Sequence, residues 1–108
     1  MRDGLYKVQF NTPLGEGYGV VTLDGGRLRG GDSMMFYTGS YQVNGNQFDA
    51  NVQTNVHSPQ AGMASVLGTG TASLTLTGNF NGDSGTMKGS SPQAPNIPFS
   101  ATLTRIAD

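Results

Sequence analysis

Few residues in this chain have a type and spacing that could do chemistry, and the first is a serine in Gly82-Asp83-Ser84-Gly85. The same four residues surround the nucleophilic serine in one class of serine proteases. Such a serine needs a base and an acid aligned with it, and His57 is the single histidine of the chain. With 108 residues, the chain is too short for the two barrels of such a protease. Because Asn81-Gly82 is typical of a hairpin turn, we interpret this segment as a turn and not as a catalytic site.

His57 is also the only imidazole that could bind a metal ion. It follows a polar run at the end of a predicted strand, and Asp49 is the only acid expected on the same face. Zinc sites draw their ligands from cysteine, histidine and carboxylates, and the sequence has no cysteine. We therefore expect a solvated histidine at the surface, and neither a metal ion nor a cofactor.

Two glycine-rich segments could approach a ligand closely. Gly15-Glu16-Gly17-Tyr18-Gly19 resembles a phosphate-binding loop, but the apolar strand pattern Val20-Val21-Thr22-Leu23 follows it. Phosphate-binding loops need the amides and dipole of a following helix, so we interpret this segment as the start of a bent strand. Asp32 follows Gly30-Gly31. An aspartate in this position commonly caps a turn through the neighbouring backbone, and we predict that role for it.

Charge and composition exclude several classes of function. Six Lys and Arg oppose seven Asp and Glu, which gives a net charge of -1. Nucleic-acid affinity rests on clustered cations, and Arg27 and Arg29 form only a small basic spot, so we expect no nucleic-acid binding. The lack of cysteine excludes disulfides, thiolate metal sites and thiol nucleophiles. With no paired carboxylates and no second histidine, we predict that the protein is not an enzyme.

The location of the protein follows from the absence of long apolar runs. No stretch approaches the roughly 20 apolar residues that a membrane-spanning helix needs, so we expect no membrane association. The segment from Met1 to Lys7 contains an acid and no apolar run, unlike a secretory signal. We therefore expect a cytoplasmic protein.

Apolar and polar residues alternate along most of the chain, which is typical of strands with one buried face. In residues 46–57, for example, Phe48, Val52 and Val56 share one face, while Gln47, Asp49 and Asn51 share the other. No segment shows a helical period. The predicted strands are, in chain order, residues 6–10, 17–23, 27–30, 35–43, 46–57, 71–80, 85–90 and 98–106.

Turn residues separate these strands. Asp24-Gly25-Gly26, Asn44-Gly45 and the segment 81–85 each predict a tight hairpin connection. We expect Asn44 and Gly45 to be the two central residues of their turn, both with positive φ. Residues 90–98 are rich in proline and predict a loop. Residues 58–70 are expected to form a loop, with one short turn of helix at 64–67 as an alternative.

We predict a single all-β domain over residues 1–108, folded as a small up-and-down, lipocalin-like antiparallel barrel of about eight strands. Closure into a barrel removes exposed strand edges and gives each strand one inner face. A two-sheet sandwich is the alternative. The residues expected to line the barrel interior are Tyr6, Val8, Phe10, Phe48, Val52, Val56, Leu74, Leu76, Phe80, Phe99 and Leu103.

The N-terminal half also resembles a known family. Asp3-Gly4-Leu5-Tyr6, Gly15-Glu16-Gly17, Gly30-Gly31-Asp32, Tyr37 and Gly39 agree in order and spacing with the GrlR family over residues 1–52. Members of this family are negative regulators of type III secretion. The resemblance implies a small lipocalin-like barrel, often dimeric, that sequesters a transcriptional activator by protein–protein contact.

One position departs from the family pattern. The best-known regulator of the family binds its activator through an exposed acidic cluster, which by spacing falls here on Val43, Asn44, Gly45 and Asn46. None of these residues is acidic, so electrostatic complementarity to a basic partner is lost here. We name residues 43–46 as a possible partner-contact loop, without carrying over the specific activator.

Three functions stay open at this stage. The first is a GrlR-like regulator that binds a protein partner, and the second is a carrier of a small apolar ligand in the barrel interior. The third is a self-associating structural module, in line with a homodimer, because charged residues that protect strand edges are sparse. The four tyrosines could line a cavity, and Met34 to Tyr37 could form a buried strand or a lid.

Overall fold

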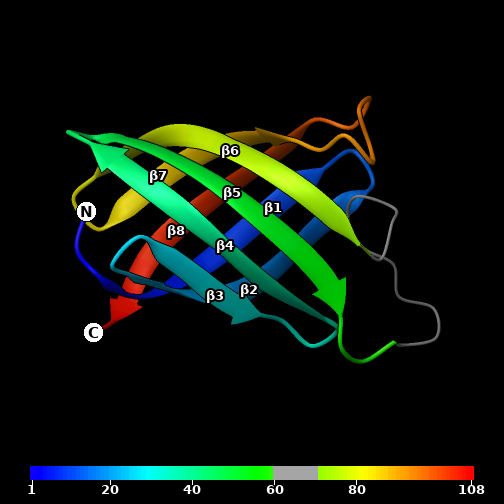
Figure 1. Ribbon diagram of the computed structural model, residues 1–108, viewed down its shortest axis with the longest axis horizontal. Coiled ribbons are helices and arrows are strands. Elements are labelled where there is room, and N and C mark those ends of the chain that lie inside the picture. Colours follow the sequence, from blue (N-terminus) through cyan, green and yellow to red (C-terminus); the bar gives the residue numbers. More distant parts are fainter. Residues whose placement is uncertain (60–70) are drawn as a thin grey trace.

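The computed structural model describes residues 1–59 and 71–108, which form a closed barrel of eight strands (Figure 1). The described residues include no helix. In chain order the strands are β1 (Gly4–Thr12), β2 (Gly15–Asp24), β3 (Arg27–Gly31), β4 (Met35–Asn44), β5 (Gln47–Val56), β6 (Ala72–Asn81), β7 (Ser84–Ser90) and β8 (Phe99–Ala107).

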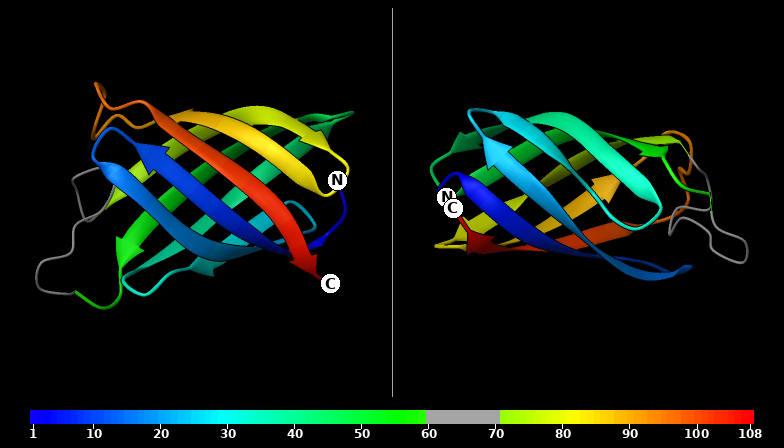
Figure 2. Two further views of the ribbon diagram at one scale, coloured as in Figure 1. Left: turned by 180° about the vertical axis from the view of Figure 1, so that it is seen from behind. Right: turned by 90° about the horizontal axis from the view of Figure 1, so that it is seen from below.

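Each strand pairs antiparallel with the next one along the chain, and β1 closes the barrel against β8. Lys7, for example, lies opposite Val20 of β2 on one side and Thr104 of β8 on the other. Both chain termini consequently lie at the same end of the barrel (Figure 2). This arrangement confirms the predicted up-and-down barrel over the sandwich.

The period of two in the sequence is the physical origin of the barrel's two faces. Inward residues along β5 and β6 are mostly buried, and the residues between them face solvent. Nine of the eleven residues predicted to line the interior are buried, whereas Phe10 and Val56 are partly buried and pack against the core. The alternation therefore predicted the inner face of the barrel correctly.

Tight turns join the strands at the end of the barrel where the termini lie. Gly25 and Gly26 connect β2 to β3, and Gly82 begins the turn between β6 and β7 with a φ of 66°. The turn between β4 and β5 differs from the prediction, because Asn44 pairs with Gln47 and the two central residues are Gly45 and Asn46. Only Gly45 has a positive φ, of 62°. Glycine tolerates this conformation without a steric penalty, so the turn is shifted by one residue.

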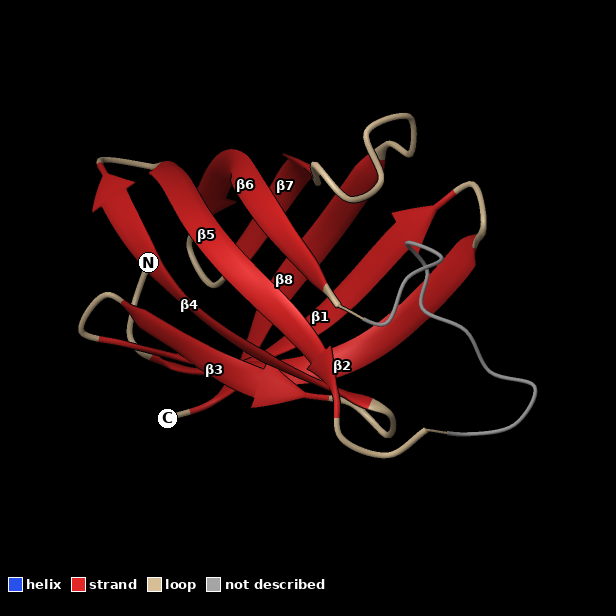
Figure 3. Cartoon of the chain, turned by 45° about the vertical axis from the view of Figure 1, so that its right-hand side comes forward, coloured by secondary structure: helices blue, strands red, loops and turns tan. Residues whose placement is uncertain are grey.

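The opposite end of the barrel carries the two-residue turn between β1 and β2 and the longer loops between β3 and β4 and between β7 and β8 (Figure 3). One side chain holds the loop between β7 and β8 against the start of β6: the Gln93 side-chain oxygen accepts hydrogen bonds from the Ser73 amide at 2.9 Å and the Ser91 hydroxyl at 3.0 Å. The predicted helical turn at 64–67 lies outside the described residues. None of the described residues forms a helix long and apolar enough to cross a bilayer.

Candidate functional site

The barrel interior is filled at the end where the termini lie. Tyr6, Phe48 and Phe80 form a chain of ring contacts, with centroid distances of 5.7 Å between Tyr6 and Phe80 and 5.3 Å between Phe48 and Phe80. Tyr41 stacks on Phe48 at 5.3 Å. Tyr6 and Phe48 are fully buried. We call this half of the interior the packed end.

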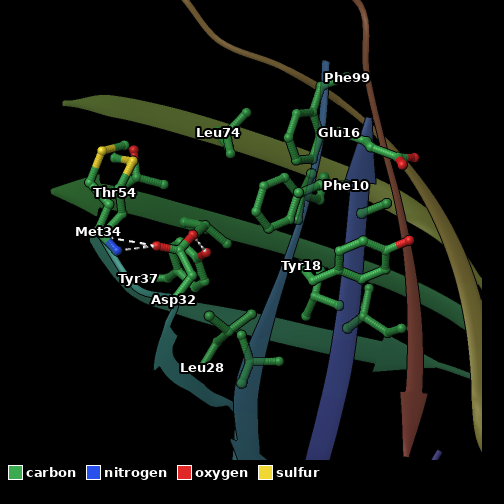
Figure 4. Close-up of a pocket in the computed structure, with 18 of the residues that line it drawn as sticks. Phe10, Glu16, Tyr18, Leu28, Asp32, Met34, Tyr37, Thr54, Leu74 and Phe99 are labelled. Atoms are coloured by element: carbon green, nitrogen blue, oxygen red, sulfur yellow. Dashed lines mark hydrogen bonds between the residues drawn. The ribbon is translucent and has the colours of Figure 1, made fainter. Parts of the chain in front are cut away.

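The other half of the interior contains a cavity of about 250 Å³ (Figure 4). An apolar cavity of about 150 Å³ is large enough for benzene, so by proportion this one can hold a ligand of about ten non-hydrogen atoms. We call this half the hollow end. The apolar residues around the cavity are Val8, Phe10, Val21, Leu28, Met34, Met35, Val52, Leu74, Leu76, Phe99, Ala101 and Leu103.

The polar part of the cavity lining comes mainly from two neighbouring segments. Asp32 and Ser33 belong to the loop between β3 and β4, and Glu16 and Tyr18 belong to the first half of β2. β3 is short and pairs with β2 only at Val20–Asp24. Among the described residues, the first half of β2 therefore has no strand partner on the side that faces β3. Because Glu16, Tyr18 and Ser33 are exposed, the cavity reaches solvent here.

Two inward glycines of β2 explain where the aromatic rings of the hollow end lie. A Cβ on Gly17 would be 2.5 Å from Phe10 Cε2, and one on Gly19 would be 2.9 Å from the Tyr37 hydroxyl. The rings occupy the space that side chains at these positions would fill. Phe10 in turn lies edge-on to Tyr37 at 6.3 Å and stacks with Phe99 at 6.2 Å. The glycine-rich segment of β2 thus serves packing and not phosphate binding.

Asp32 is the best-anchored polar side chain of the cavity. Its Oδ1 accepts hydrogen bonds from the amides of Met34 at 2.9 Å and Met35 at 2.7 Å, and its Oδ2 accepts one from the Tyr37 hydroxyl. The first two bonds confirm the predicted turn-capping role. Burial raises the pKa of Tyr37 above the ordinary tyrosine value, and the hydrogen bond to Asp32 and the charge of Asp32 raise it further. The tyrosine therefore stays protonated and donates to the carboxylate.

His57 is exposed, as predicted, but it also supports the loop that carries Asp32. Its Nε2 lies 2.9 Å from the backbone oxygen of Asp32, and its Nδ1 lies 2.6 Å from the Ser58 hydroxyl. A carbonyl oxygen can only accept, so Nε2 carries the proton. The His57 amide also donates to the backbone oxygen of Met34 at 2.9 Å. His57 consequently fixes the loop from outside and does not line the cavity.

The predicted lining residues divide between the two ends. Val8, Phe10, Val52, Leu74, Leu76, Phe99 and Leu103 line the cavity, while Tyr6, Phe48 and Phe80 fill the packed end. Val56 is partly buried and packs against the core without lining the cavity. Of the four tyrosines, Tyr18 and Tyr37 line the cavity, and Tyr6 and Tyr41 do not.

Several cavity residues were missed by the sequence analysis. Val21 and Leu28 follow the same period-two pattern as the predicted residues and could have been included. Thr54 and Ala101 also share a strand face with predicted residues, but Thr54 is less apolar than its neighbours on that face and Ala101 is smaller than its neighbours. The position of Asp32 at the cavity has no signal in the sequence, because it depends on the path of the loop between β3 and β4.

Two other predicted features lie away from the cavity. The possible partner-contact loop of Val43, Asn44, Gly45 and Asn46 forms the exposed turn between β4 and β5, at the packed end. Ser84 pairs with Asn81 across a hairpin turn, and Asp83 forms an ion pair with Arg2 at 2.7 Å. This geometry confirms that the segment around Ser84 is a turn.

The described residues contain no group of three or more His, Asp or Glu side chains that could hold a metal ion. A comparison with models of known protein families found no match, and a search among curated proteins found none either. The likeness to the GrlR family therefore stays a prediction that rests on the residues quoted for it.

Proposed function

We propose that this protein binds a small, mostly apolar molecule in the cavity at the hollow end of the barrel. The observation that carries this proposal is the cavity itself. Protein interiors are normally close-packed, and voids larger than a water molecule are few. Barrels of about eight strands either fill their interior with side chains or leave room for one small ligand. In this barrel side chains fill the packed end, and the hollow end leaves room for a ligand.

The composition of the cavity wall supports an apolar ligand. Twelve apolar side chains surround the space, and a small number of polar groups gather at the side where it reaches solvent. Ligand sites combine apolar walls with few polar groups in this manner. A ligand of about ten atoms would bind with micromolar to millimolar affinity, given the usual binding energy per atom.

A cavity-filling variant tests this proposal. We expect 1-octanol to bind the wild-type protein in a calorimetric titration and to raise its unfolding temperature by mass action. Ala101→Phe places a ring in the cavity and should abolish binding. The matched control is Ser100→Phe, which adds the same ring to the exposed neighbouring position and should leave binding unchanged.

Two results would contradict the proposal. One is the absence of any octanol binding to the wild-type protein, and the other is equal binding by the wild type and Ala101→Phe. Val52→Phe fills the cavity from β5 instead of β8 and repeats the test if Ala101→Phe does not fold.

We propose protein contact as a second function, because apolar side chains also gather on the outer surface. Val20 and Phe36 are 43% and 40% exposed, and they lie on either side of Gly31 in neighbouring strands. Tyr18, 57% exposed, follows on the same outer face of β2. Exposed apolar patches of this kind often contact other proteins. A GrlR-like regulator would need such a surface for its partner or for a homodimer.

The double variant Val20→Thr/Phe36→Ser tests this second function. It should dissociate a homodimer in sedimentation analysis, or prevent recovery of a regulatory protein that co-purifies with the wild type from the native host. A wild-type protein that is monomeric at high concentration and recovers no regulatory protein would remove the second function and leave the first untouched.

A further inference from the structure

We propose that the cavity selects ligands that carry a hydrogen-bond donor, with a preference for a cationic amine, and rejects carboxylates such as fatty acids. This inference rests on the proposed binding of an apolar ligand and adds the chemistry of its polar end. It comes from the charges around the cavity and from the direction of the hydrogen bonds there.

The charges around the cavity all have one sign. Asp32 lines the space, Glu16 borders its opening from the exposed face of β2, and no Lys, Arg or His is among the lining residues in the described part of the chain. Burial of an unpaired carboxylate has a high desolvation cost. A fatty acid would bring its carboxylate toward that of Asp32 and would find no Lys, Arg or His among the described lining residues to pair with. An ammonium group, in contrast, would find a partner in Asp32.

At Asp32 and at the two buried hydroxyl groups of the lining, the hydrogen bonds occupy the donors and leave acceptor positions for a ligand. A carboxylate has about four lone-pair positions, and Asp32 uses three of them for the Met34 amide, the Met35 amide and the Tyr37 hydroxyl. The remaining position, on Oδ2, can accept a bond from a ligand.

The two buried hydroxyl groups of the lining also favour a ligand that donates a hydrogen bond. Tyr37 donates its proton to Asp32, and Thr54 donates its proton to the Ala72 backbone oxygen at 3.4 Å. Each can therefore offer only its oxygen lone pairs to a ligand. A ligand with an N–H or O–H group fits these side chains, and a ligand with acceptors alone does not.

The surrounding rings are compatible with a cation. Figure 4 shows Phe10, Tyr37 and Phe99 around the same space as Asp32. Aromatic faces attract an ammonium group within about 6 Å of the ring centroid. We therefore place the head of the ligand at Asp32 and its apolar part among side chains such as Leu74 and Leu76, deeper in the barrel.

Three probes with the same eight-carbon chain separate these possibilities: octylamine, 1-octanol and octanoate, each titrated calorimetrically at pH 7. We expect octylamine to bind most tightly and octanol next, with octanoate weaker than octylamine by about tenfold or more. Asp32→Asn removes the charge but keeps a side chain that caps turns equally well. In this variant the advantage of octylamine over octanol should disappear.

Asp24→Asn is the matched control, because it removes one exposed carboxylate on the outer face of β2 at the packed end. It changes the net charge by the same amount and should leave the order of the probes unchanged.

The outcomes distinguish this inference from the proposed function. If octanoate binds as tightly as octylamine, or if Asp32→Asn leaves the preference unchanged, the selectivity is wrong and the apolar cavity remains a binding site. If none of the three probes binds the wild-type protein, the proposed function fails and the inference fails with it.

Discussion

The two ends of the barrel interior differ in how they use the same strand pattern. At the packed end, large rings from β1, β4, β5 and β6 contact one another, and Tyr6 and Phe48 are fully buried. At the hollow end, the rings of Phe10 and Tyr37 occupy the space beside the inward Gly17 and Gly19 of β2, and most of the other lining side chains are aliphatic. These residues surround a cavity of about 250 Å³ within an otherwise closed barrel.

Because of this difference, one end of the barrel supplies packing energy and the other end supplies the space for a ligand. A close-packed cluster of aromatic side chains buries much apolar area and gives large stabilisation. A cavity gives up part of that packing energy, because its walls lack contact atoms on one side. The packed end can therefore hold the barrel together while the hollow end remains available for a ligand.

The largest expected effect comes from removing a ring at each end. Phe48→Ala should lower the free energy of unfolding by about 3–5 kcal/mol, because it leaves a new void in a filled region. Phe10→Ala should cost about 1–2 kcal/mol, because Phe10 is only partly buried and already borders a cavity. Urea unfolding of both variants measures the difference. Equal losses would show that the two ends are packed alike, and Phe48→Leu replaces Phe48→Ala if the latter does not fold.

A smaller effect is expected from adding the same atoms at each end. Ala50 is 2% exposed, lies opposite Tyr41 and Leu76, and does not line the cavity. Ala50→Leu should therefore cost about 1–3 kcal/mol through overpacking. Ala101→Leu extends into the cavity and should be neutral or stabilising by about 0.5–2 kcal/mol. A thermal unfolding series that shows a loss for both variants would argue against a real cavity beside Ala101.

The smallest effect at neutral pH is expected for Tyr37→Phe, which removes the hydrogen bond to Asp32. Asp32 keeps its two bonds from backbone amides, so we expect a loss of about 1 kcal/mol. Chemical unfolding at pH 7 measures it, and an unchanged stability would mean that this bond adds nothing beyond what water supplies.

The same variant changes how stability depends on pH. The pKa of Tyr37 in the folded protein lies above the ordinary value of 10.0, so the stabilisation is fully present below pH 10. Above that pH the unfolded chain loses a proton that the folded chain keeps, and stability falls by up to about 1.4 kcal/mol per pH unit for each such tyrosine. Burial also raises the pKa values of Tyr6 and Tyr41. Tyr37→Phe should therefore reduce the slope above pH 10 without abolishing it, and an unchanged slope would contradict this account.

Much of the fold could be predicted because strand patterns are local. The alternation over residues 46–57 predicted a strand that is observed at Gln47–Val56, and Asn81-Gly82 predicted a turn between β6 and β7. The turn at Gly45 was predicted one residue too early, because Asn and Gly can each occupy either central position and only the register of the two strands decides between them.

The candidate site could be predicted only in part. Seven of the predicted interior residues line the cavity, because inward direction follows from alternation. The sequence did not distinguish them from Tyr6, Phe48 and Phe80, which fill the other end. Whether an inward residue meets another ring or an empty space depends on neighbours that are far away in the chain.

The sequence by itself determined the strands, most of their turns and the face that each strand buries, because these depend on residues one or two positions apart. Only the tertiary structure decided that the barrel is filled at one end and hollow at the other, and that Asp32 lies beside the hollow end, where its carboxylate accepts three hydrogen bonds. These features depend on closure of β1 against β8 and on side chains that meet across the interior, and no local pattern in the chain encodes such distances.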